Sequence, residues 1–456
     1  MVNKKKTKMT IWQYLTLGYL TVIIVGTLLL LLPFATNAGE PQTGFVDALF
    51  TATSATCITG LIPFDTATHF TLFGQIVILC MIQLGGLGFM TFVTIIFRTI
   101  GKKSGVYETK ALMLSAGEDN RQELHRLFRN LLIGTLIFEL IGAAVLSIRF
   151  IPEFGFGQGV YFSVWHSVSA FCNAGFDLMG GVHTANTVVS LTRYASDPLV
   201  CITISLLICI GGLGFCVWDD IWVNRFQIKK YKLHTKVVLL MTAIILLLST
   251  VLFLLFEWSN PEITNLNFWQ KSCVAFFNAC TPRTAGFSVI DYSTASDGTY
   301  LLTLMSMFIG GSPASTAGGV KTTTLFVIIM GTISVFQGKR DIEVGKRRVH
   351  NSLLRQALAV FVACLFLTMI SCLLIGVLES GNAQIGIKEI LFEVVSAIAN
   401  VGLSMGVTPD LTVASKIILA LLMFVGRVGI VTFALAFAER KDAAEVKKPV
   451  DTMLIG

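Results

Sequence analysis

Four glycines recur along the chain at nearly equal spacing. Gly60, Gly175, Gly286 and Gly402 are separated by 115, 111 and 116 residues, and one quarter of the 456-residue chain is 114. Small residues stand six and five positions before each glycine. An aromatic residue stands ten positions before it, namely Phe50, Trp165, Phe276 and Phe392. The spacing predicts four diverged copies of one structural unit.

The residues beside these glycines indicate the chemistry. We define four filter segments, each ending at one of the glycines: Cys57, Ile58, Thr59 and Gly60; Cys172, Asn173, Ala174 and Gly175; Arg283, Thr284, Ala285 and Gly286; and Ala399, Asn400, Val401 and Gly402. None contains a carboxylate, so the ligands would be backbone carbonyls, which glycine can orient through uncommon backbone angles. A ring of carbonyls can replace the hydration shell of K⁺. The segments therefore predict a K⁺ site, and the alternative is that glycine turns merely let helices pack closely.

A second stretch of small residues, GGSPASTAGGVK, interrupts an apolar run. Its members are Gly310, Gly311, Ser312, Pro313, Ala314, Ser315, Thr316, Ala317, Gly318 and Gly319, followed by Val320 and Lys321. The proline and the glycines should break the helix at membrane depth. Alignment of the four units places Arg427 at the position of Gly86, Gly212 and Gly311, so Arg427 should face the break. The alternatives are a snorkelling or structurally paired Arg427, and a Lys321 that reaches solvent.

The elements that position these residues are membrane helices. The chain is 54% hydrophobic and 13% charged, with a mean hydropathy of +0.76, which argues against a soluble enzyme, a nucleic-acid binder and a disulfide scaffold. Long apolar runs predict eight spans, near 11–33, 71–98, 126–150, 198–223, 234–257, 300–337, 353–378 and 412–438. Shorter re-entrant segments are predicted near 45–56, 160–172, 267–281 and 387–398.

We therefore expect an all-α integral membrane protein with four parallel repeats of helix, pore loop and helix around a pseudo-fourfold axis. The repeats should cover residues 1–110, 111–230, 231–350 and 351–456. The termini and three connections hold 26 of the 34 lysines and arginines. By the positive-inside rule both termini are cytoplasmic, in a multi-pass protein of the cell membrane. The basic connections 225–236 and 339–355 are the expected contact surface of a regulatory subunit.

Six motifs in chain order resemble the Trk/Ktr/HKT superfamily of potassium transporters, most closely the membrane subunit of bacterial Ktr systems. They are SATCITGL (54–61), QLGGLGFMTF (83–92), SAFCNAGF (169–176), TPRTAGF (281–287), GGSPASTAGGVKTTT (310–324) and FVGRVG (424–429). The resemblance implies a potassium-conducting homodimer on a cytosolic ring of nucleotide-binding subunits of the KtrA or KtrC kind. It also implies that the broken stretch 310–321, here named the gate loop, gates the pore together with Arg427.

Within this superfamily a serine in place of the first filter glycine accompanies sodium permeation, and all four positions here are glycine. The family's sodium dependence makes Na⁺ a candidate activator and keeps a sodium-coupled secondary transporter as the alternative function. No HExxH or GxSxG motif points to an enzyme. The gate loop lacks the context of a phosphate-binding loop, so no organic cofactor is expected.

We also predict the surroundings of three further polar residues. Arg283 should turn behind the third filter segment and hold carbonyls or a carboxylate such as Glu393 or Asp47. His166 should be a satisfied core histidine, and Glu139 a paired residue of its helix.

Overall fold

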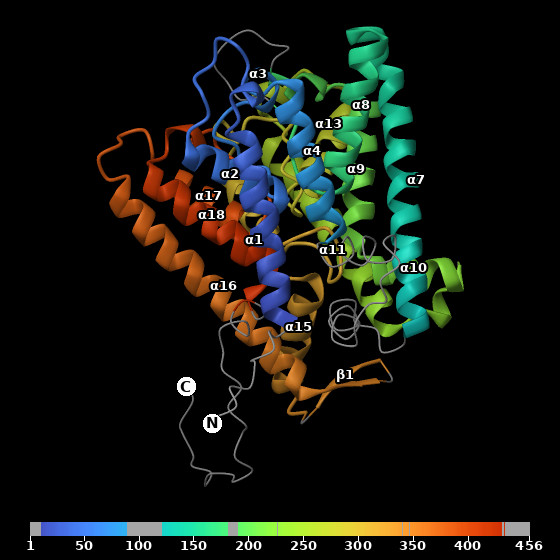
Figure 1. Cartoon of the computed structure of the whole chain (residues 1–456). Coiled ribbons are helices and arrows are strands. Elements are labelled where there is room, and N and C mark those ends of the chain that lie inside the picture. Colours follow the sequence, from blue (N-terminus) through green and yellow to red (C-terminus); the bar gives the residue numbers. More distant parts are fainter. Residues whose placement is uncertain are drawn as a thin grey trace, which may run out of the picture.

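The structure is a computed structural model, and it describes residues 11–88, 121–180, 190–225, 227–339, 341–345, 347–430 and 433. Within these residues the chain is almost entirely helical, and the single sheet is a hairpin of β1 (Ile342–Val344) and β2 (Arg347–Val349). In Figure 1 the hairpin lies at the lower end of the molecule, and we refer to the upper and lower faces as drawn there.

The same order of helices occurs four times. A helix comes first: α1 (Ile11–Leu30), α7 (Arg121–Phe154), α11 (Leu233–Glu257) and α16 (Asn351–Leu378). A shorter helix follows: α2 (Phe45–Thr56), α8 (Phe156–Phe171), α13 (Phe268–Cys280) and α17 (Ile387–Ala399). A third helix then begins: α4 (Leu72–Leu87), α9 (Pro198–Leu213), α14 (Asp297–Phe308) and α18 (Val413–Val428). Each predicted span and each predicted re-entrant segment therefore contains a helix.

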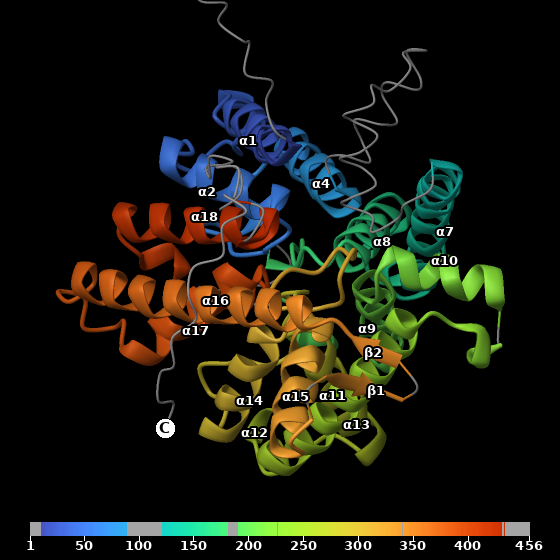
Figure 2. The ribbon, with the colours of Figure 1, turned by 90° about the horizontal axis from the view of Figure 1, so that it is seen from below.

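Seen from below, the four groups of helices lie in chain order around a common centre (Figure 2). Five short elements join helices within a group: η1 (Pro33–Ala35), α3 (Thr66–His69), η3 (Thr192–Tyr194), α12 (Pro261–Thr264) and η5 (Thr408–Asp410). A sixth, η4 (Ile228–Lys230), lies between the second and third groups. Two further helices, α10 (Phe215–Asn224) and α15 (Thr322–Phe336), continue α9 and α14 beyond a break.

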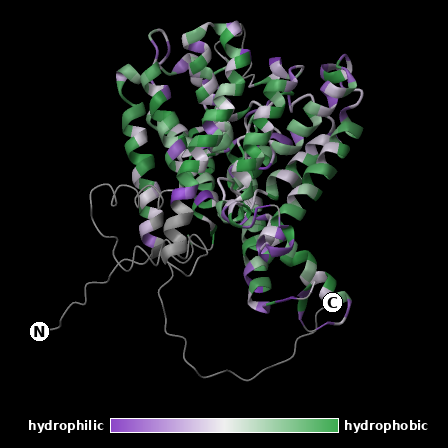
Figure 3. Cartoon of the chain, turned by 90° about the vertical axis from the view of Figure 1, so that its right-hand side faces the viewer, coloured by the Kyte–Doolittle hydropathy of each residue, from purple (hydrophilic) through white to green (hydrophobic). Residues whose placement is uncertain are grey.

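The short helices form the core, and the long helices surround it. Phe50, Trp165, Phe277 and Phe392 of the short helices are fully buried. The sequence pattern had selected Phe276, which is only partly buried. On α11 the exposed residues Leu240, Ile244, Leu247, Val251 and Leu255 recur at helical spacing. Such an apolar stripe on the outside is typical of a helix that faces lipid, and Figure 3 shows apolar residues over much of the helical surface.

Three helices of the described residues are long and apolar enough to cross a membrane, namely Arg129–Phe154, Leu233–Glu257 and Asn351–Leu378. The pair α9 and α10 adds a fourth if it is counted as one span, although it bends by 92°. The span predicted over 198–223 therefore consists of two helices with a sharp bend between them. Gly214, with φ +98°, joins the two helices, because glycine adopts this backbone conformation without a steric penalty.

Candidate functional site

The four filter segments share one backbone conformation. Ile58, Asn173, Thr284 and Asn400 stand two residues before the four glycines, and all four have positive φ angles, between 53° and 72°. The glycines themselves have φ angles of 98°, 71°, 81° and 90° in chain order. A residue other than glycine seldom adopts positive φ, so its occurrence at the same position in four segments indicates a shared structural demand.

Hydrogen bonds to the preceding helix hold three of the segments in the same way. Thr59, Ala174 and Val401 each donate a backbone N–H at 2.8 Å to the carbonyl of the serine five residues earlier. Two of these serines, Ser54 and Ser396, also accept the glycine N–H at 3.0 Å. The N–H groups thus point back toward the helix. In the third segment Ala285 donates instead to Thr281 O, four residues earlier, at 2.9 Å.

The segments meet in a closed ring. A Cβ added to Gly60 would come within 2.5 Å of Ala174 O, one on Gly175 within 2.6 Å of Ala285 O, and one on Gly286 within 2.5 Å of Val401 O. A Cβ on Gly402 would come within 2.0 Å of Thr59 O, which returns to the first segment. Each glycine therefore packs against the carbonyl that precedes the next glycine. No larger residue fits at these positions unless the backbone shifts.

A cavity of about 80 Å³ lies against this ring, and all four filter glycines line it. The other lining residues include Ser190, Ser288, Ser404 and Thr408. Asp177 is the one charged residue among those that line it. The sequence analysis did not select Asp177, although it is the first charged residue after the second filter glycine.

The helices that follow the filter segments approach the short helices closely. A Cβ on Gly85, Gly211 or Gly426 would come within 2.0–2.2 Å of a carbonyl near the end of α2, α8 or α17, respectively. Three residues later, Gly88, Gly214 and Gly429 have φ angles of 79°, 98° and 90° and end α4, α9 and α18. A positive-φ glycine therefore ends each of these three helices at the matching position.

The gate loop joins α14 to α15 and runs against the break between α9 and α10. Ser312 N donates to Gly212 O at 3.1 Å, and Phe215 N donates to Ala314 O at 2.7 Å. Val320 pairs with Ile309 where the loop returns. A Cβ on Gly318 would come within 2.4 Å of Ala399 O of the fourth filter segment. The loop therefore contacts both a helix break and the ring.

Two cationic side chains bind the gate loop. Arg427 donates from Nη1 to Thr316 O at 2.5 Å and from Nη2 to Gly85 O, so it bridges the loop to the end of α4. This confirms the expectation that Arg427 faces the break. Lys321 donates from Nζ to Ala317 O at 2.6 Å and to Gly318 O at 3.2 Å. We considered two positions for the Lys321 ammonium group, on the gate loop or in solvent. The structure places it on the gate loop.

The prediction that Arg283 holds carbonyls or a carboxylate such as Glu393 or Asp47 is wrong. Arg283 is buried behind the third filter segment, but its Nη2 donates to Thr242 Oγ1 of α11 at 3.3 Å. Glu393 instead accepts from Ser404 and from Thr408, and Asp47 pairs with Lys416 at 2.9 Å. Thr242 precedes Arg283 by 41 residues, and no spacing in the sequence signals the contact.

The other two expectations concern single polar residues. His166 is fully buried, its Nδ1 lies 2.7 Å from Phe162 O, and its Nε2 accepts from Leu178 N at 3.4 Å. It is a satisfied core histidine, as predicted. The carboxylate of Glu139 accepts a weak hydrogen bond from Cys172 Sγ across 3.9 Å, and its backbone carbonyl accepts from Ser167 Oγ at 2.6 Å. Glu139 thus connects α7 to α8.

Comparison with known proteins agrees with this arrangement. Residues 12–447 match the TrkH family model, described as a cation transport protein. The chain is 38% identical to the potassium/sodium uptake protein NtpJ of Enterococcus hirae, over all of this chain and 99% of that protein. It is 39% identical to the Ktr system potassium uptake protein B of Bacillus subtilis, over 94% of both chains. It is 34% identical to the protein of that name from Vibrio alginolyticus, over 97% of this chain and 94% of that protein.

A solved structure has the same fold. The potassium transporter TrkH from Vibrio parahaemolyticus superposes with a TM-score of 0.70 at 18% identity, over 95% of this chain and 86% of that one. The family match and the fold are those of a membrane cation transporter. The chain belongs to the TrkH family of cation transport proteins.

Proposed function

We propose that this protein is the potassium-conducting membrane subunit of a regulated uptake system. The closed ring of filter segments supports the proposal most directly. Each filter glycine packs against the carbonyl that precedes the next glycine, and backbone carbonyls are the ligands that K⁺ filters use. The proposed K⁺ ligands are the carbonyls of the four filter segments. The names of relatives from Bacillus and Vibrio, which are potassium uptake proteins, also support it.

The electrostatics suit a monovalent cation. The helices α2, α8, α13 and α17 end within a few residues of the ring, and a helix C-terminus carries a partial negative charge. No side-chain carboxylate belongs to the filter segments, whereas sites for divalent cations usually rely on carboxylates. Asp177 lines the cavity beside the ring, where its carboxylate, when ionised, would raise the local concentration of cations.

The gate loop and Arg427 would form the barrier to conduction. Arg427 holds the loop against the end of α4, and it places a positive charge beside the path of a permeating cation. In this arrangement the repeats are 1–110, 111–230, 231–350 and 351–456, and eight spans surround four re-entrant helices. The lower face, with its exposed Lys229, Lys230, Arg347 and Arg348, would face the cytoplasm.

The assembly would be a homodimer bound to a cytosolic ring of nucleotide-binding subunits. A regulatory partner is expected because the basic connections at 225–236 and 339–355 are short and the relatives are named as parts of a Ktr system. No organic cofactor and no enzymatic step are invoked.

A sodium-coupled secondary transporter is the second candidate, because the Enterococcus relative is named a potassium/sodium uptake protein. Flux into liposomes separates the two. We expect K⁺ to move down its gradient in the absence of Na⁺, with Na⁺ acting at most as an activator. K⁺ movement that requires Na⁺ transport in a fixed ratio would support the coupled transporter. A protein that moves neither ion would contradict both.

A further inference from the structure

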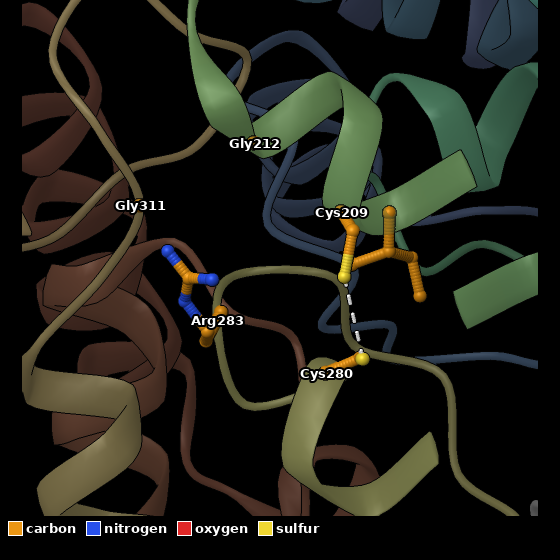
Figure 4. Close-up of a pocket in the computed structure, with 6 residues that line it drawn as sticks. Cys209, Gly212, Cys280, Arg283 and Gly311 are labelled. Carbon is orange, nitrogen blue, oxygen red and sulfur yellow. Dashed lines mark hydrogen bonds between the residues drawn. The ribbon is translucent and has the colours of Figure 1, made fainter. Parts of the chain in front are cut away.

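Two thiols face each other behind the third filter segment (Figure 4). Cys209 lies near the end of α9 and Cys280 is the last residue of α13, and their sulfur atoms are 3.4 Å apart. This distance is close to contact, and neither sulfur is part of a disulfide. Together with Arg283, Gly212 and Gly311 the two cysteines line a small cavity of about 10 Å³, roughly the space that one water molecule needs. Both helices are elements of the core, so the two thiols are held in place.

Arg283 carries an uncompensated charge in this cavity. Its side chain is 5% exposed, its Nε has no hydrogen-bond partner, and Nη2 is bound only by the Thr242 hydroxyl. Among the described residues, the groups near Arg283 that can carry negative charge are the two thiols. A buried cation is stabilised by a nearby anion, and a cationic neighbour in turn favours the thiolate, the reactive form of cysteine.

The pair lies between the filter and the gate loop. Cys280 is three residues before Arg283, which begins the third filter segment. Cys209 is two residues before Gly211, and the carbonyl of the next residue, Gly212, accepts the Ser312 N–H of the gate loop. A covalent link between the two sulfurs would tie the end of α13 to the part of α9 that braces the loop.

We propose that Cys209 and Cys280 form a redox modification site, at which hydrogen peroxide converts the two thiols into a disulfide that lowers ion flux. One sulfur attacks a peroxide oxygen, which breaks the O–O bond, releases water and leaves a sulfenic acid. The second sulfur then displaces the hydroxyl as another water, and the S–S bond forms. The two thiols lose two electrons, and hydrogen peroxide gains them. The disulfide cannot ionise, so Arg283 loses its available counter-charge.

The test uses the full-length protein in liposomes, with hydrogen peroxide as the oxidant and dithiothreitol as the reductant. After oxidation, free thiols are blocked with N-ethylmaleimide and the linked peptides are identified by mass spectrometry. We expect an intramolecular link between Cys209 and Cys280, together with a severalfold loss of K⁺ flux that dithiothreitol reverses. Wild-type protein suffices for this measurement, so the result does not depend on the folding of a variant.

Two variants test whether the loss of K⁺ flux after oxidation depends on this pair of cysteines. Cys209→Ala should abolish both the link and the peroxide sensitivity. Cys201→Ala removes another thiol of α9, whose Sγ lies 3.2 Å from Tyr194 O, and it should leave both intact. The absence of the link, or a link that leaves flux unchanged, would overturn the proposal. The flux measurement depends on the function proposed above. A protein without K⁺ flux in the reduced state contradicts that function, whereas equal flux in both states contradicts only the redox site.

Discussion

Gly402 is the residue at which the ring of filter segments is tightest. A Cβ there would lie 2.0 Å from Thr59 O, and its φ angle is 90°. We expect Gly402→Ser to move the fourth segment away from the first. The converging carbonyls would then be displaced, and the K⁺ preference over Na⁺ should fall toward equal rates. Competitive flux of the two ions in liposomes measures the change.

A matched control separates the effect of the close contact at Gly402 from the effect of its positive φ angle. Gly39 has a φ angle of 104°, but a Cβ there would meet nothing within 4 Å. Gly39→Ser should therefore strain its backbone without a change in selectivity. If Gly402→Ser reaches the membrane and keeps the wild-type ratio of K⁺ to Na⁺ flux, the ion path does not pass through this ring.

The sequence was informative about residues that repeat and uninformative about residues that do not. The four filter glycines could be found because each unit demands the same positive φ angle, which leaves a periodic signal. Arg283 occurs in one unit only, where it meets Thr242 of α11 and the thiols of Cys209 and Cys280. A contact between distant elements that is present in only one of the four units produces no regular spacing in the sequence. Such a contact cannot be predicted from spacing.

Among the elements, the gate loop is held chiefly by backbone contacts and by Arg427. Two unit charges about 6 Å apart repel by roughly 2.8 kcal/mol at an effective dielectric of about 20, which corresponds to about a hundredfold in rate as an upper limit. Arg427→Ala removes this charge and the bridge between Thr316 O and Gly85 O. Deletion of residues 314–318 removes the loop itself. Both changes should raise basal K⁺ flux in the absence of the regulatory subunit.

The variant Arg427→Lys separates the effect of the positive charge from the effect of the hydrogen-bonded bridge between Thr316 O and Gly85 O. It keeps the positive charge, but a single ammonium group cannot reproduce the planar guanidinium that binds both carbonyls. We expect its basal flux to lie between those of the wild type and Arg427→Ala. If Arg427→Ala and the deletion variant both retain selectivity and conduct no faster than wild type, neither Arg427 nor the loop limits conduction.

Two glutamates connect successive helices at the upper face. Glu379 caps α16 and accepts from Thr412 N at 2.9 Å and Thr412 Oγ1 at 2.8 Å, at the start of α18. Glu257 ends α11 and accepts in the same way from Ser296 N and Oγ, at the start of α14. Burial raises the pKa of Glu379, but the hydrogen bonds from Ser415 and Thr412 outweigh it, so the pKa lies below the ordinary value of 4.5.

This pKa shift predicts how the stability of α18 depends on pH. A carboxyl group with a lowered pKa in the folded state stabilises that state above its unfolded pKa, and the stabilisation is lost as the pH falls through its folded pKa. Glu379→Gln should therefore cost about 2 kcal/mol at pH 7, and the cost should shrink below about pH 4.5. Thermal unfolding in detergent measures it.

Glu343→Gln is the control for Glu379→Gln, because Glu343 is exposed and forms a surface ion pair with Lys339. Such pairs contribute little to stability, so the free energy of unfolding should barely change. A Glu379→Gln variant as stable as wild type at pH 7 would contradict the role assigned to the hydrogen bonds.

The order of helices could be predicted from the sequence better than their ends. Apolar runs and turn residues marked each helix, because the lipid face and the core both demand apolar side chains. The helix ends at Gly88, Gly214 and Gly429 were missed, because two or three glycines without a proline within an apolar run are compatible with a continuous helix. Only the gate loop, with a proline and four glycines, carried enough breakers to be recognised.

At the scale of the molecule, charge is distributed unevenly between the two faces. On the lower face, β1 and β2 expose Arg347 and Arg348, and the connection after α10 exposes Lys229 and Lys230. Arg348 pairs with Asp341 at 3.0 Å, and the other three form no ion pair among the described residues. Unpaired surface cations leave a positive field on this face. Under the proposed function, this field would orient the lower face toward the cytoplasm and attract an acidic surface of the regulatory partner.

If the regulatory ring binds this surface, reversal of Lys229, Lys230, Arg347 and Arg348 to glutamate should abolish copurification of the two proteins. Neutralisation to glutamine should weaken it less, and high salt should weaken the wild-type complex, because the attraction is electrostatic and exposed. Arg193 of η3 and Lys388 at the start of α17 lie outside the lower face and form ion pairs with Glu153 and Asp297. Their reversal to glutamate is the matched control and should leave binding intact. Retained K⁺ flux shows that the reversed protein is folded. Copurification that survives the fourfold reversal would mean that the partner binds elsewhere.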